Sequence, residues 1–73
     1  LFDSMTVFDN LAYPLREHTK LNPKEIVERV MAQLEELGMG HARSLFPSQL
    51  SGGMQKRVGL ARAMLLNPDI ILY

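Results

Sequence analysis

A chain of 73 residues has room for one small domain at most. It contains no cysteine, so no disulfide can stabilise it, and its two histidines lack the spacing of a metal site. Eight basic residues balance eight acidic ones, and this lack of a basic excess argues against a module that binds duplex nucleic acid. Residues 41–68 nevertheless carry four basic residues and no acidic one, a local excess that suits a phosphate ligand.

The first predicted helix covers residues 7–18, the stretch VFDNLAYPLREH. Thr6 fits its N-cap, and Val7, Leu11 and Leu15 share one stripe of the helix. Pro14 lies inside the stretch, where a proline removes a backbone hydrogen bond and clashes with the preceding turn. We therefore expect Pro14 to kink the helix or to end it early.

The second predicted helix has clear signals at both ends. Asn22 fits the N-cap, Pro23 the first helical position and Glu25 the third. Gly38 fits the position just after the helix, which favours glycine. Apolar residues recur between these ends at steps of three and four, as in an amphipathic helix; they are Ile26, Val27, Val30, Met31, Leu34 and Leu37.

A connector follows over residues 38–50. It has room for one short helical turn around residues 41–45. Pro47 predicts an extended approach to Leu50, because a proline restricts the backbone around it.

Ser51 fits the N-cap of a third helix that runs to about Leu66. The residues expected on its buried side are Val58, Ala61, Met64 and Leu65. Residues 69–73, DIILY, are apolar and partly β-branched, which predicts a short strand buried on both faces. Because such a strand needs neighbours in a parallel sheet, we expect the chain to be a piece of a larger α/β protein.

Three small residues, the Ser-Gly-Gly segment (Ser51–Gly53), stand directly before the basic part of the third helix. A helix N-terminus leaves about four N–H groups unbonded and carries roughly half a positive charge. Glycines there let an anion approach the backbone, and Ser51 adds a hydroxyl donor. Lys56 and Arg57 raise the positive potential nearby. Taken alone, the segment is open to two interpretations, a phosphate seat and an ordinary helix cap.

The string LSGGMQKRVGLARA, followed by NPDIIL, resembles the signature segment of ATP-binding cassette (ABC) ATPases, whose usual form begins LSGGQ. The stretch MTVFDNLAYPL looks like the region just after the Q-loop of the family, and residues 23–50 look like its helical subdomain. Met54 stands where the family usually has glutamine. This methionine, together with LFDSMTVFDNLAYPLREHT, is similar to the ATPases of Mla-type, MCE-associated lipid transporters.

The resemblance implies an α/β P-loop NTPase for the parent protein. This part of it should be mainly α-helical, with about three helices and one short β-strand at the end. Residues 1–22 would be the segment and helix after the Q-loop, and residues 23–50 the helical subdomain. Residues 51–66 would be the signature motif and its helix, and residues 69–73 the start of the Walker B strand.

The resemblance also implies how ATP is used. In the family, two nucleotide-binding domains, here a homodimer of the parent protein, close head to tail over two ATP molecules. The Ser-Gly-Gly residues Ser51, Gly52 and Gly53, with Met54 beside them, would contact the γ-phosphate of the ATP held by the other subunit. No P-loop pattern G-x-x-x-x-G-K-[ST] occurs, and the Mg²⁺ ligands and catalytic acids of the family have no match in the chain. We therefore assign no catalytic residue and expect residues 1–73 alone not to hydrolyse ATP.

A transmembrane permease is the second partner that the resemblance implies. It places the parent protein in the cytoplasm, peripheral to the inner or plasma membrane, in a system that transports phospholipid. The stretch from Leu1 to about Tyr13 resembles the region that lines the groove for the membrane subunit. Phe2, Met5 and Phe8 are the candidates for this contact, and core packing is an equally open interpretation for them.

Two other classes of function compete with this interpretation. One is a stand-alone helical protein-interaction module without ATPase activity. The other is a helix-turn-helix protein with Gly52 and Gly53 in the turn, which would offer Gln55, Lys56 and Arg57 to DNA. The zero net charge disfavours this second alternative.

Overall fold

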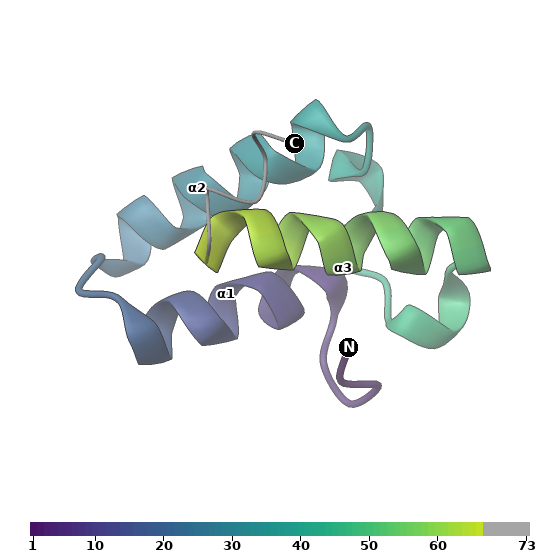
Figure 1. Ribbon diagram of the computed structural model, residues 1–73, viewed down its shortest axis with the longest axis horizontal. Coiled ribbons are helices and arrows are strands. Elements are labelled where there is room, and N and C mark those ends of the chain that lie inside the picture. The colour runs from purple at the N-terminus through teal and green to yellow at the C-terminus, as the bar shows by residue number, and fades with distance from the viewer. Residues whose placement is uncertain (67–73) are drawn as a thin grey trace.

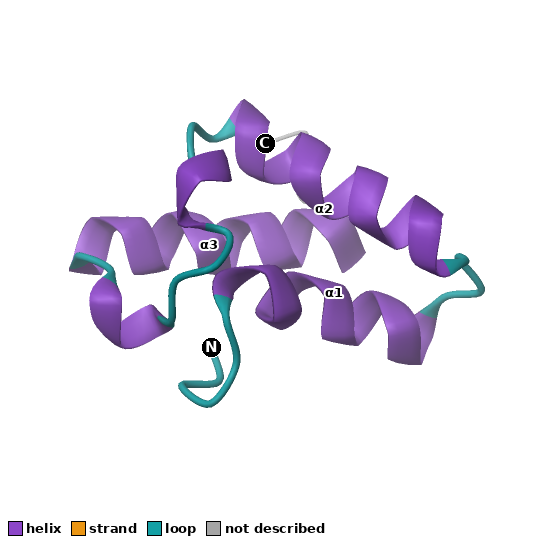
Figure 2. Cartoon of the chain, turned by 180° about the vertical axis from the view of Figure 1, so that it is seen from behind, coloured by secondary structure: helices purple, strands orange, loops and turns teal. Residues whose placement is uncertain are grey.

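The computed structural model describes residues 1–66 of the chain, and their regular structure is helical. The α-helices are α1 (Val7–His18), α2 (Pro23–Glu36) and α3 (Gly52–Leu66). Helices α1 and α2 form an antiparallel pair, and α3 runs alongside and packs against both of them (Figures 1 and 2). The prediction of a mainly helical chain with about three helices is confirmed for this part. The strand predicted at residues 69–73 falls outside the described residues.

Helix α1 begins at its predicted cap. The Thr6 hydroxyl oxygen accepts a hydrogen bond from the backbone N–H of Asp9 at 3.2 Å, and the predicted stripe of Val7, Leu11 and Leu15 is fully buried. The helix nevertheless runs through Pro14 to His18, so the expectation of an early end is wrong. Pro14 is itself buried, and burial of its ring offsets the loss of one backbone hydrogen bond.

Helix α2 has the capping box that its sequence predicts. The Asn22 side chain accepts from the backbone N–H of Glu25 at 2.8 Å, and the Glu25 carboxylate accepts from the backbone N–H of Asn22 at 3.0 Å. Gly38 follows the helix with φ of +70°, a conformation that favours glycine. Along the predicted apolar face, Ile26, Val30 and Leu34 are buried and Met31 and Leu37 are half-buried. Val27, by contrast, is 47% exposed.

Removal of this cap has a predictable effect on stability. We expect Asn22→Ala to lower the free energy of unfolding by about 1 kcal/mol, because the backbone N–H of Glu25 loses its capping partner. Urea denaturation of a full-length protein that carries this segment measures the change. Lys24→Ala, an exposed change in the same turn, should leave the unfolding midpoint in place. Equal midpoints for the two variants would contradict the capping role.

The core lies where the three helices meet. In α3, Val58 and Ala61 are fully buried as predicted, whereas Met64 and Leu65 are half-buried. The connector contributes Met39, Ala42 and Leu50 to the same core, and its Pro47 is buried as well. Helix α3 and the connector therefore share one core with α1 and α2, and this core holds the start of α3 in place.

The connector contains two single-turn 3₁₀ helices, η1 (Gly40–Ala42) and η2 (Pro47–Gln49). The first corresponds to the turn predicted around residues 41–45. The second corrects the prediction of an extended approach after Pro47. It is Phe46, before the proline, that is extended (φ −93°, ψ 155°), while Pro47 opens the turn. Proline restricts the residue before it, but its own fixed φ suits the first position of a helical turn.

Candidate functional site

The Ser-Gly-Gly segment forms the N-terminal end of α3. Leu50 comes just before it, is extended and is 8% exposed, so the core anchors the entry to the helix. The Ser51 hydroxyl oxygen accepts from the backbone N–H of Met54 at 3.1 Å, and the Ser51 carbonyl accepts from that of Gln55 at 2.9 Å. Ser51 is therefore the predicted N-cap. Its hydroxyl proton is free to donate to a further group.

Nothing within residues 1–66 requires a glycine at position 52 or 53. Both residues are exposed, and neither has a positive φ. A Cβ atom added to either would meet no other heavy atom within 4 Å. In this part of the chain no hydrogen bond uses the backbone N–H of Gly52 or Gly53. The two glycines thus leave exposed, unpaired donors at the positive end of a helix, the arrangement that binds anions.

Two positively charged residues follow this helix end. Lys56 and Arg57 are exposed in the next turn of α3. Among residues 1–66 the only ion pair joins Arg16 to Asp9 at 3.9 Å, so no acid in this part forms an ion pair with Lys56 or Arg57. Asp3 is the acidic residue that lines the same hollow as Gly52 and Lys56. Their charges add to the helix dipole, and both favour a negatively charged ligand at Ser51.

Two further side chains fix the geometry of the Ser-Gly-Gly segment. The Gln55 amide donates to the carbonyl of Pro47 at 2.8 Å and so ties the first turn of α3 to η2. Met54 is half-buried and packs against the core. Of the four predicted nucleotide contacts, Ser51, Gly52 and Gly53 are exposed, whereas the Met54 side chain supports them from the core side.

Of the three residues predicted to contact a membrane subunit, Phe2 and Met5 lie in the loop before α1 and Phe8 lies in α1. Phe2 is 50% exposed, and its ring centroid is 6.0 Å from the guanidinium carbon of Arg62 in α3. Phe8 packs against the core and lines a hollow of about 590 Å³ on the α2 side of α1, together with the exposed Val27. Met5 is half-buried in the loop before α1. Phe8 thus packs against the core on one side and borders this hollow on the other.

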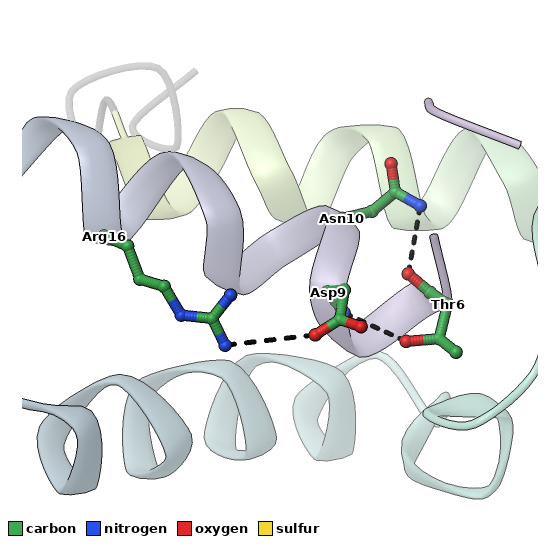
Figure 3. Close-up of polar contacts among 4 residues, drawn as sticks. All are labelled: Thr6, Asp9, Asn10 and Arg16. Carbon is green, nitrogen blue, oxygen red and sulfur yellow. Dashed lines mark hydrogen bonds and ion pairs between the residues drawn. The ribbon is translucent and has the colours of Figure 1, made fainter. Parts of the chain in front are cut away.

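Asn10 is a structural residue that the sequence analysis did not single out. It is 1% exposed, and its side chain points away from the Asp9–Arg16 ion pair (Figure 3). The signal that could have revealed it is its spacing, since it stands three residues after Val7 on the buried face of α1.

Residues 1–66 contain no group of three or more His, Cys, Asp or Glu side chains that could hold a metal ion. Within that range, no helix combines the length and the apolar character that crossing a membrane demands.

Comparison with known proteins gives the family. The family model described as ABC transporter matches residues 1–73. The chain belongs to the ABC transporter family. This result confirms the family that the LSGG string predicts and favours it over the helix-turn-helix and stand-alone alternatives.

Curated members of the ABC transporter family match almost the whole chain. The probable ribonucleotide transport ATP-binding protein mkl of Mycobacterium leprae is 54% identical over 72 residues, which make up 99% of this chain and 21% of that protein. The intermembrane phospholipid transport system ATP-binding protein MlaF of Escherichia coli K12 is 53% identical over 73 residues, 100% of this chain and 27% of MlaF. MlaF of Haemophilus influenzae is 48% identical over the same length, 28% of that protein. The similarity to Mla-type ATPases is thus confirmed, and the chain spans about a fifth to a quarter of these relatives.

Proposed function

We propose that this chain is the signature-motif and helical-subdomain part of an ABC transporter ATP-binding protein. In the full-length dimer, the Ser-Gly-Gly segment closes over the ATP bound to the P-loop of the other subunit. Residues 1–22 follow the Q-loop, residues 23–50 form the helical subdomain, and residues 51–66 carry the signature motif. Residues 69–73 begin the Walker B strand.

One observation carries this proposal. Gly52 and Gly53 open α3 without any need for glycine in their φ angles or their packing, and their N–H groups are unpaired in residues 1–66. If the segment were only a helix cap, replacing either glycine with alanine would make the helix more stable. A ligand that approaches the backbone closely would explain two glycines beside a capping serine, and for a member of the ABC transporter family we propose the terminal phosphate of ATP as this ligand.

The chemistry at this end of α3 is electrostatic. The Ser51 hydroxyl and the N–H groups of Gly52 and Gly53 donate to phosphate oxygens, and Lys56 raises the local potential. These donors bind a γ-phosphate and lose their acceptor when it leaves. Their contribution therefore differs between the ATP and ADP states, and this difference couples dimer closure to hydrolysis. Mg²⁺ accompanies ATP in the family, but residues 1–66 gather no set of ligands that fits a magnesium centre.

The transported substrate that we propose is phospholipid. Two of the relatives above are named for intermembrane phospholipid transport, and Met54 follows the Mla-type pattern. The proposed partners are a second copy of the protein and a transmembrane permease, which holds the protein at the membrane surface. Phe8 and Val27, at the hollow on the α2 side of α1, are the proposed permease contacts, with Phe2 and Met5 at the loop before α1.

A mixed dimer tests whether the contact is made across the dimer. One full-length copy carries Ser51→Arg and the other carries an inactivated P-loop. In the mixed dimer, the intact P-loop of the first copy faces the intact Ser51 of the second, so one complete site remains. We expect doubly tagged mixed dimers, purified with their permease, to hydrolyse ATP faster than a dimer of either variant alone.

The control is a doubly tagged dimer in which both copies carry Ser51→Arg, which should remain inactive. A mixed dimer that is no faster than this control would contradict a contact between subunits.

A further inference from the structure

The loop before α1 (residues 1–5) is held by one buried amide. The Asn10 side-chain carbonyl accepts from the backbone N–H of Phe2 at 2.7 Å. The Asn10 amide nitrogen lies 3.0 Å from the carbonyl oxygen of Phe2, 3.2 Å from that of Met5 and 3.0 Å from that of Thr6. Because Asn10 is 1% exposed, these bonds are shielded from water and fix the loop on α1.

The same loop contacts α3. The Phe2 ring faces the guanidinium of Arg62 at 6.0 Å, within the range of a cation–π interaction. The Nε atom of Arg62 is buried and has no hydrogen-bond partner among residues 1–66. Within that range, the polar end of the Arg62 side chain contacts the Phe2 ring. Leu1 and Asp3 of the loop also line a hollow of about 470 Å³ beside Gly52 and Lys56 of α3.

We propose that Asn10, Phe2 and Arg62 are positioning residues that make the loop at residues 1–5 and the signature helix move as one unit. Asn10 fixes the backbone of Phe2, and the Phe2 ring meets Arg62. Arg62 belongs to the same continuous helix that begins just after Ser51. A displacement of the loop is therefore transmitted along α3 to the Ser-Gly-Gly segment.

This inference rests on the proposed function only for its effect on ATP turnover. The mechanical link itself is tested without nucleotide. Spin labels are attached to cysteines introduced at Ser4 and Leu60, both exposed, in a full-length protein freed of other cysteines and bound to its permease. Pulsed electron paramagnetic resonance then measures the distribution of distances between the two labels.

Phe2→Leu is the test variant, and Tyr13→Leu is its matched control because Tyr13 is an exposed aromatic residue of α1. We expect the distance distribution to broaden in Phe2→Leu and to stay unchanged in Tyr13→Leu. Asn10→Asp, which sets a carboxylate oxygen against carbonyls, should broaden it as well. If the distance distributions of Phe2→Leu and Tyr13→Leu were equally wide, the proposed link between the loop and α3 would be overturned. This outcome does not depend on the role of Ser51.

Turnover in the same complex tests whether the link serves catalysis. Phe2→Leu and Arg62→Gln should each lower kcat by roughly two- to fivefold, with KM for ATP unchanged. Since both variants break one contact, the double variant should be no slower than the slower single variant. Losses that multiply in the double variant, or a broadened distribution with unchanged kcat, would overturn the positioning role.

Discussion

Ser51→Arg is expected to lower ATP turnover of the full-length transporter by about 100-fold or more, the loss typical when a preorganised donor is removed. The arginine side chain would fill the space in front of Gly52 and Gly53, where the phosphate of the other subunit is proposed to approach. The variant also loses the hydroxyl that accepts from the N–H of Met54, at a cost of about 1 kcal/mol in stability. Nucleotide should still bind, because each subunit keeps its own P-loop.

Two controls separate the phosphate contact from the helix cap in this experiment. Ser51→Thr keeps both the hydroxyl and the cap, so it should retain most of the turnover. Ser48→Arg places the same charge on an exposed serine of η2 and should leave turnover unchanged. The readouts are steady-state phosphate release and equilibrium binding of a fluorescent ATP analogue. Near-native turnover in Ser51→Arg would contradict the proposed function.

Gly53→Ala is expected to make the protein more stable and much less active. Gly53 is helical, and an added methyl group meets nothing within 4 Å in residues 1–66. Alanine should therefore raise the free energy of unfolding by about 0.5–1 kcal/mol. The same methyl group blocks the approach of a phosphate to the backbone N–H groups, so turnover should fall by about 100-fold. Urea denaturation and phosphate release measure the two effects on one sample.

Gly59→Ala is the matched control, because Gly59 lies two turns further along α3 and an added methyl group there also meets no atom within 4 Å. We expect this variant to show the same gain in stability with unchanged turnover. If Gly53→Ala and Gly59→Ala had the same turnover, the glycine at position 53 would be only part of a helix cap.

Local signals in the sequence predicted the elements of the fold well. Thr6, Asn22 and Ser51 all cap the helices that they were expected to cap. Capping depends on residues within about three positions of one another, so it can be read along the chain. The exposed position of the Ser-Gly-Gly segment at the start of a helix could also be predicted, because it depends on a helix end and on residue types that need no distant partner.

Predictions that depended on distant parts of the chain were less successful. Pro14 was expected to kink α1 or to end it early, but the helix continues to His18, and burial of Pro14 in the three-helix core offsets its local cost. Val27 has the spacing of a core residue, yet it is 47% exposed, because the core takes only the narrow stripe of α2 that α1 and α3 cover. Pro47 was expected to lead into an extended segment, but it begins the 3₁₀ helix η2. The Gln55 side chain of α3 donates a hydrogen bond to the carbonyl of Pro47 in this turn.

The sequence by itself determined the family, the order and caps of the three helices, and the Ser-Gly-Gly segment as the candidate phosphate site. These features follow from short-range backbone hydrogen bonding, helical periodicity and a specific string of residues. Only the tertiary structure decided that Asn10 holds the loop at residues 1–5, that Phe2 meets Arg62, and that Met54 packs into the core. Such contacts join segments far apart in the chain, and no local spacing specifies which side chains meet when three helices share one core.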